Sequence, residues 1–377
     1  MIEFSLKSGL IRRVTSLPIS VTDSFEIKSP LKRILTIGGI LGSFMFSACS
    51  EMNNEPLDPN TPTLNSNKGD ILTLTTIKTG DLIRIKGTAN ELAPEGAANR
   101  STSAAGNDRG RFNISLKFIT PVTENQRQVF DDAAARWERI IIQDVPSITG
   151  TIPSAFANFP PVVTDGTIDD IIIEVALAPI DGRGGILGQA GPRFYRNVDL
   201  LPVTGVMFFD VADLDFLDEL DLFEEVIVHE MGHVLGVGTA WANFGRSLRQ
   251  DPNGNPYFNG KFANTHWNAE GGTDFLPIEN MGGQGTRLSH WRESVLRNEL
   301  MTGFINLGEN PLSRITAASM RDLGYGAAVV GEQYELERGT PGVDINELAA
   351  SGALEGINIA EMEVILEPIG VVETNNK

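Results

Sequence analysis

The first strong pattern in the chain is an alternation of apolar and polar residues over RFNISLKFI, residues 111–119. A period of two predicts a β-strand with one buried face. Thr123 and Gln126 then have the capping-box form that opens a helix, and the apolar residues after them recur every three or four positions. The predicted buried stripe of this helix consists of Phe130, Ala133, Ala134, Trp137, Ile140 and Ile141.

Two more strands and the order of the elements predict the fold class. IDDIIIEVALAPI, residues 168–180, is apolar enough for a central strand, and GVMFFD, residues 205–210, predicts another short strand. Strand, helix, strand, strand and a further helix predict an α+β domain, with a mixed twisted sheet and helices packed against it. We take GVMFFD as the candidate edge strand, where an extended peptide can pair with the sheet.

The further helix is predicted to begin upstream of a histidine pair and to contain it. Asp221 and Glu224 again have the capping-box form, and the helix continues through His233 until Gly236 or Gly238 ends it.

This helix contains VIVHEMGHVLGVGTAW, with the H-E-x-x-H pattern at His229, Glu230 and His233. Residues four apart on a helix point the same way, so both imidazoles can bind one metal ion. A catalytic zinc takes three protein ligands and a water, whose proton a carboxylate can accept. The pattern therefore predicts one catalytic Zn²⁺ with Glu230 as the general base. The alternative is two histidines that merely pack on a partly buried helix.

The third zinc ligand is not evident from this segment alone. Thr239 stands where the commonest extended pattern has a third histidine, and a threonine hydroxyl is a poor neutral zinc ligand. The other two histidines of the chain are His266 and His290. His266 lies in NTHWNAEGG, which we expect to be a surface loop, whereas His290 precedes a predicted helix, residues 292–300.

Three segments together resemble the leishmanolysin-type metzincins, including their bacterial relatives. They are HEMGHVLGVGTAW, GTRLSHWRESVLRNELMTG and LSRITAASMRDLGYG, and the resemblance covers about residues 111–326. In that family a long insertion follows the glycine of the histidine pattern, and the third histidine lies in a Ser-His-Trp sequence. By position, the resemblance implies zinc ligands at His229, His233 and His290, a general base at Glu230 and a Met-turn residue at Met301.

The same resemblance implies a zincin-type, metzincin-like fold. An N-terminal catalytic subdomain, residues 111–236, would hold the sheet and the active-site helix, and a C-terminal catalytic subdomain, residues 237–330, would lie across the cleft. The disulfides and the cysteine switch of the eukaryotic members are not expected, because Cys49 is the only cysteine.

The N-terminal part carries a predicted export signal. Residues 34–48, ILTIGGILGSFMFSA, are apolar or small and follow Lys32 and Arg33, as in a signal peptide. FSAC, which ends at Cys49, resembles the lipobox of bacterial lipoproteins, in which the cysteine becomes lipidated. We therefore predict a signal peptide over residues 1–48, a lipid anchor at Cys49 and a location in the cell envelope or outside the cell. The alternative is a plain signal peptide with an incidental cysteine.

The remaining segments are less informative. Residues 49–110 predict a tether and a small N-terminal region with two short strands within residues 71–87, and residues 331–377 form a tail of unassigned role. The tail includes VILEPIGVVE, which has the pattern of a strand. The tryptophans at 241, 267 and 291 are expected to pack rather than bind. Asp169, Asp170, Asp210, Asp213 and Asp215 lack the spacing of a calcium loop and predict a solvated acidic rim.

Charge narrows the partners. The formal net charge of −19 argues against nucleic acid, whose phosphates need a basic surface. A protein or peptide substrate is expected, and a membrane only through a lipid at Cys49. The predicted function is a zinc endopeptidase acting on extracytoplasmic proteins. The alternative is a cell-surface binding or adhesion protein that uses the zincin scaffold without turnover, which loss of Glu230 or a ligand would favour, and neither is lost.

Overall fold

The structure is a computed structural model that describes residues 72–78, 80–89, 111–283, 285–307, 309–334 and 356–374. The predicted signal peptide and Cys49 lie outside these residues. The helices are α1 (Glu124–Ile140), α2 (Val211–Glu219), α3 (Phe223–Leu235), α4 (Lys261–Ala269), α5 (Glu293–Leu296), α6 (Arg314–Leu323) and α8 (Ile359–Met362). The strands are β1 (Ile83–Ala89), β2 (Ile114–Phe118), β3 (Ile148–Ile152), β4 (Val163–Ile168), β5 (Ile171–Ala178), β6 (Gly188–Arg196), β7 (Pro202–Asp210), β8 (Arg249–Gln250), β9 (Tyr257–Phe258), β10 (Leu276–Pro277), β11 (Ile305–Asn306), β12 (Gly356–Ile357), β13 (Glu363–Ile365) and β14 (Gly370–Thr374). Within these ranges, no helix combines the length and the apolar character that crossing a membrane requires.

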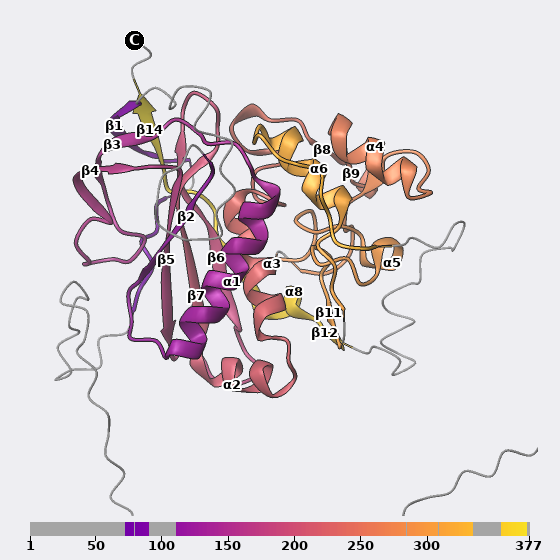
Figure 1. The fold of residues 1–377 in the computed structure, drawn as a ribbon, viewed down its shortest axis with the longest axis horizontal. Helices are drawn as coiled ribbons and strands as arrows, with labels where there is room; N and C mark the ends of the chain where they lie inside the picture. Colours follow the sequence, from indigo (N-terminus) through magenta and orange to yellow (C-terminus); the bar gives the residue numbers. More distant parts are fainter. Residues whose placement is uncertain are drawn as a thin grey trace, which may run out of the picture. The chain divides into compact units, whose positions relative to one another are not determined.

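Nine strands of the described residues form one mixed sheet (Figure 1), in the order β2-β5-β7-β6-β14-β1-β3-β4, with β13 paired to β6. β2, β5 and β7 are parallel, and β6 runs antiparallel to β7. β5 lies between β2 and β7, the interior position that its apolar sequence predicts. A mixed sheet with helices against it is the coarse architecture that the order of elements predicts.

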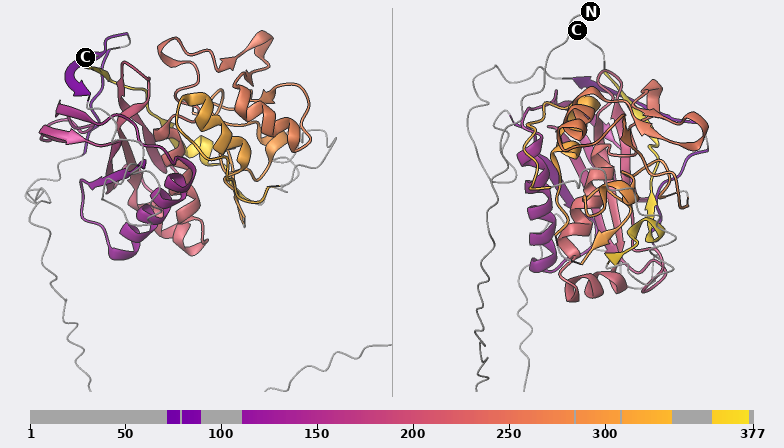
Figure 2. Two further views of the ribbon diagram at one scale, coloured as in Figure 1. Left: turned by 45° about the horizontal axis from the view of Figure 1, so that its top comes forward. Right: turned by 90° about the vertical axis from the view of Figure 1, so that its right-hand side faces the viewer.

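α1 and α3 pack on each other beside the sheet (Figure 2). The Thr123 hydroxyl accepts the Gln126 N–H, and the Gln126 side chain accepts the Thr123 N–H, so the predicted capping box opens α1. The predicted apolar stripe is buried. Within it, the Trp137 indole donates to the carbonyl of Val228 on α3 at 2.9 Å. The amphipathic pattern of α1 therefore fixes it against the histidine-bearing helix.

α3 begins differently from its prediction and ends as predicted. No side chain caps its N-terminus, because Asp221 takes a left-handed conformation (φ 59°) in the turn from α2. The capping box predicted from Asp221 and Glu224 is therefore wrong, and Glu224 pairs with Arg136 of α1 instead. The helix ends at Gly236, whose φ of 117° suits glycine because a side chain disfavours the left-handed region.

GVMFFD is not an edge strand, so that prediction is wrong. It forms most of β7, which lies between β5 and β6 and is buried along its whole length. The sequence of β6, GQAGPRFYR, contains Gly and Pro and gives no strand signal. β6 nevertheless forms a strand that pairs with β7, so β7 has a neighbouring strand on both sides.

The sheet also uses strands from outside residues 111–330. β1 comes from the segment in which short strands were predicted, and VILEPIGVVE contributes to β13 and β14. β14 lies between β6 and β1 and is parallel to both. One strand of the C-terminal tail, which had no assigned role, is thus an internal part of the sheet.

Three of the five aspartates expected on a solvated rim are buried: Asp170, Asp210 and Asp213. The physical reason is backbone hydrogen bonding. One Asp210 oxygen accepts the N–H groups of Ile180, Asp181 and Gly182 at 2.7–2.8 Å. Such a carboxylate organises a loop rather than facing solvent.

Residues 237–334 hold a small sheet of order β10-β9-β8 together with α4, α5 and α6. Asp322 of α6 accepts the N–H groups of Phe262 and Ala263, which fixes the start of α4. The three tryptophans are buried, and the rings of Trp241 and Trp291 stack with centroids 4.5 Å apart. Their predicted packing role agrees with this burial.

Candidate metal centre

Three histidines from two parts of the chain converge at one point. His229 and His233 lie one turn apart on α3, and His290 lies just before α5. The Nε2 atoms are 3.0 Å apart for His229 and His233, and each is 3.1 Å from Nε2 of His290. All three side chains are fully buried. The structure thus brings together the three residues at which the sequence predicts zinc ligands.

Backbone carbonyls orient the three rings. In each ring Nδ1 contacts one carbonyl oxygen: that of Leu300 for His229 (2.7 Å), Val237 for His233 (2.9 Å) and Thr286 for His290 (3.1 Å). Because a carbonyl only accepts, each neutral ring carries its proton on Nδ1 and presents a lone pair at Nε2. Three lone pairs that face one another contain no donor, and a cation between them satisfies all three.

The donor set and its spacing fit zinc. Ligand atoms about 2.0–2.1 Å from a tetrahedral ion lie roughly 3.3 Å apart, which is close to the observed Nε2 separations. Burial lowers the pKa of His233 to about 3, and the neighbouring imidazoles act in the same direction. His233 is therefore neutral, as a metal ligand must be.

Met301 lies directly beneath the histidine-bearing turn of α3. A Cβ at Gly232, which lies between the two histidines, would come within 2.8 Å of the Met301 sulfur. The turn is held by buried Glu299, whose carboxylate accepts the N–H of Met301 at 2.7 Å and the hydroxyls of Ser313 and Thr316. Glu299 is a positioning residue that the sequence predictions did not single out. Its place in the sequence, two residues before Met301, could have pointed to it.

The loop that bears His290 docks on the end of α3. Gly238 has a φ of 74°, and a Cβ there would lie 2.1 Å from the carbonyl oxygen of Ser289. Glycine is therefore required at this contact both by the backbone conformation and by the close approach. The Thr239 hydroxyl donates to the His233 carbonyl at 2.7 Å, so it caps the helix end.

Glu363 is a fourth side chain at this site that could hold a metal ion, and the sequence predictions missed it. It is the first residue of β13, and its Oε1 lies 2.9 Å from Nε2 of His290. Its Oε2 lies 3.4 Å from Nε2 of His229 and 3.6 Å from that of His233. The ligating atoms of the three histidines and Glu363 lie within 4.8 Å of one another. Glu363 lies far along the chain from the histidines, so no sequence spacing pointed to it as a possible ligand.

Glu230 is fully buried on α3 beside Glu363. Burial raises the pKa of Glu230 well above its usual value, and the Glu363 carboxylate raises it further. Burial also acts to raise the pKa of Glu363, but His290 and His233 outweigh it and lower that pKa well below its usual value.

His266 is not part of this cluster. It lies on α4 rather than in the expected surface loop, and its side chain is half-buried. The helix predicted for residues 292–300 is also shorter, since α5 covers only Glu293–Leu296.

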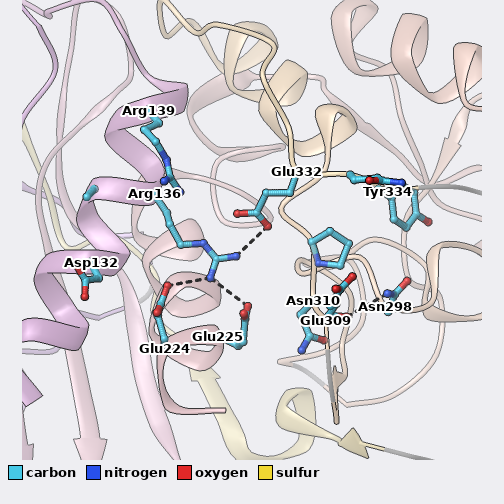
Figure 3. A pocket seen from close by; sticks show the side chains of 13 residues that line it. Asp132, Arg136, Arg139, Glu224, Glu225, Asn298, Glu309, Asn310, Glu332 and Tyr334 are labelled. Carbon is cyan, nitrogen blue, oxygen red and sulfur yellow. Dashed lines mark hydrogen bonds and ion pairs between the residues drawn. The ribbon is translucent and has the colours of Figure 1, made fainter. Parts of the chain in front are cut away.

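A cavity of ≈ 1070 Å³ lies elsewhere, along α1 and the start of α3. Its lining does not include the three histidines or Glu363. Figure 3 shows Arg136 pointing towards three acidic residues of this cavity, Glu224, Glu225 and Glu332, at 3.0–3.2 Å. Arg136 thus links α1 to α3 and to the chain after α6 through ion pairs, and these ion pairs help to fix the position of the histidine-bearing helix.

Comparison with known proteins agrees with this site. The leishmanolysin family model matches residues 138–332, which is just over half of the chain. Leishmanolysin of Leishmania chagasi is 28% identical over 197 residues, and a leishmanolysin homolog of Crithidia fasciculata is 28% identical over 167.

These matches span 49% and 41% of this chain, but only 32% and 24% of the two relatives. A leishmanolysin-like peptidase of Drosophila melanogaster is 47% identical over 49 residues, 13% of this chain and 7% of that protein. The family match covers α3, the three histidines and Met301. The chain therefore belongs to the leishmanolysin family of metallopeptidases.

Proposed function

We propose that the protein is a zinc-dependent endopeptidase that hydrolyses peptide bonds of extracytoplasmic proteins. The observation that carries this proposal is the convergence of three Nε2 lone pairs beside the buried carboxyl of Glu230. His229, His233 and His290 would hold the ion. Zinc, when bound, lowers the pKa of water and polarises a peptide carbonyl.

The protein's own groups would then guide the proton and the substrate. Glu230 would orient the attacking water, accept its proton and pass that proton to the leaving amine. Once β13 has left β6, the vacated edge would pair with the extended substrate. β13 itself marks this path, since it pairs with β6 from Gly188 onward and its first residue, Glu363, lies against the histidines. Met301 would support the metal-binding turn without touching substrate.

An extracytoplasmic location is part of the proposal. It rests on the export-signal pattern of residues 34–48 and on the lipobox-like sequence at Cys49. The adhesion alternative has weaker support, since Glu230 and all three histidines are present together.

Replacement of the base tests the function. Glu230→Gln keeps the shape of the side chain but removes its ability to accept a proton, so the variant should bind one equivalent of zinc and lose turnover by about 10²–10⁴-fold. Zinc is measured by elemental analysis, and turnover by digestion of an unbiased peptide library. Both are measured in the natural chain and in a Glu363→Ala background, because Glu363 lies at the same site.

Glu219→Gln, an exposed position at the end of α2, is the matched control and should change neither measurement. Full turnover by Glu230→Gln would remove Glu230 from the mechanism. Absence of zinc from the natural chain would remove the proposed function itself.

A further inference from the structure

The C-terminal residues 356–374 run past the metal centre. β12 pairs with β11, and one turn of helix (α8) follows (Figure 1). β13 then pairs in parallel with β6. The backbone remains on β6 afterwards, since Leu366 donates its N–H to Ala190 and Ile369 donates to Arg193. Glu363 is the residue of this path that reaches the three histidines.

We propose that this segment is a built-in inhibitor of the peptidase site, in which Glu363 is a fourth zinc ligand. The inference rests on the proposed function, because a fourth ligand has meaning only where a metal binds. A tetrahedral zinc places its fourth ligand atom roughly 3.3 Å from the other three. Oε1 of Glu363 lies 2.9 Å from Nε2 of His290, and Oε2 lies 3.4 and 3.6 Å from Nε2 of the other two histidines. The carboxylate as a whole therefore lies close to where a fourth ligand is needed.

The surroundings of Glu363 suit a bound cation. Its side chain is fully buried, and a buried carboxylate is costly unless it is paired. Among the described residues no lysine or arginine forms an ion pair with it, and the groups nearest to it are three imidazole lone pairs and the Glu230 carboxyl. One divalent cation between these groups satisfies the carboxylate and the three imidazoles together.

Occupation by Glu363 closes the site in two ways. A catalytic zinc needs an open position for water, and four protein ligands are typical of a zinc that only stabilises structure. The same segment also occupies β6, since Val364 pairs with Gln189 and Ile365 pairs with Ala190. A substrate strand therefore cannot use this edge until β13 leaves it.

The residue before Glu363 lies at a small apolar cavity. Met362 packs against the core and lines, with Leu187, Phe216 and Leu217, a largely apolar cavity of ≈ 230 Å³. The segment thus combines a metal-directed carboxylate, strand pairing and a side chain at an apolar recess.

The inhibitory contacts can be released without removing the C-terminal strand. β12 and β13 pair over only two and three residues, whereas β14 pairs with both β6 and β1 and lies inside the sheet. Truncation before residue 356 would delete β14 and damage the sheet, so a point substitution is the correct test.

The experiment compares the full chain with Glu363→Ala, Glu363→Gln and the control Glu361→Gln, an exposed glutamate on the same turn. Metal content is measured first, then turnover of the peptide library. The cobalt-substituted proteins give two readouts independent of turnover, the visible spectrum and the affinity for a small hydroxamate. We expect both Glu363 variants to gain at least about tenfold in turnover and in hydroxamate affinity, with an altered cobalt spectrum. The control should match the natural chain.

The outcomes separate this inference from the proposed function. If the natural chain binds metal and the Glu363 variants change neither spectrum nor hydroxamate affinity nor turnover, the inhibitor is disproved and the peptidase proposal stands. If the spectrum changes but no protein turns over any peptide, both proposals fail, and the site is a closed four-ligand centre. If the natural chain binds no metal, both proposals fail at the first measurement.

Discussion

Each imidazole of the metal centre is oriented by a carbonyl from a different segment. The carbonyls belong to Leu300 in the turn before Met301, Val237 after α3, and Thr286 before His290. Orientation by such partners fixes the tautomer of each ring and raises the affinity of the site. Loss of any one of these three rings should therefore weaken zinc binding, whereas loss of a half-buried histidine elsewhere should not.

His290→Ala and His266→Ala test this difference. His290→Ala removes one of three Nε2 donors and should weaken zinc by more than about 100-fold, with loss of turnover. His266→Ala alters a half-buried side chain on α4 outside the cluster and should preserve both. Chelator competition measures zinc affinity in both variants. The opposite pattern would move the third ligand to His266.

The site residues differed in how far the sequence could predict them. His229, Glu230 and His233 follow from helical spacing alone, because one turn of helix brings them together. His290 needed the family resemblance, since 57 positions separate it from His233. Glu363 could not be predicted, because only the pairing of β13 with β6 brings it to the histidines.

The element that joins the two parts of the site is the end of α3. Gly236 ends the helix and Gly238 lets the chain approach the carbonyl of Ser289, next to His290. This contact sets the distance between the helix and the loop that bears the third histidine.

Gly238→Ala tests this contact, with Gly245→Ala as its matched control. Both glycines have a positive φ, 74° and 83°, but only the Gly238 substitution would meet another atom, at 2.1 Å. Gly245→Ala should cost about 1–2 kcal/mol of unfolding free energy from backbone conformation alone. Gly238→Ala should cost about 1–3 kcal/mol more and weaken zinc, because the His290 loop must move. Urea unfolding and chelator competition measure the two effects, and equal results for both variants would contradict the docking role.

Sequence patterns predicted elements best where one residue pattern determined the packing. The capping box and apolar stripe of α1 and the apolar run of β5 are examples. The pattern did not predict β6, because Gly and Pro disfavour a strand in isolation. Pairing with the neighbouring strands β7 and β14 stabilises it in the sheet. The pattern failed at the start of α3 because Asp221 is used in a turn from α2, an element that the pattern did not predict.

For the whole molecule, the predicted lipid anchor lies at Cys49, outside the described part of the chain. We predict acylation at Cys49, so Cys49→Ser should release the protein or leave it unprocessed. Labelling with radioactive fatty acid and fractionation of cells measure this. Absence of label from the natural chain would contradict the lipid anchor and leave the plain signal peptide.

The interior position of β14 also constrains how the protein is made. Ile83 pairs with Gly370, so among the described residues β1, β3 and β4 join the rest of the sheet through β14, which is synthesised after every other strand that the structure describes. Pairing across such a long separation is slow, and it cannot begin until those residues leave the ribosome. Glu363 lies a few residues upstream of β14 on the same path along β6, so we expect the pairing of β14 to bring it near the histidines. On the inhibitor proposal, completion of the sheet and blockage of the peptidase site therefore belong to the same late stage of folding, so a molecule that has just folded is inactive.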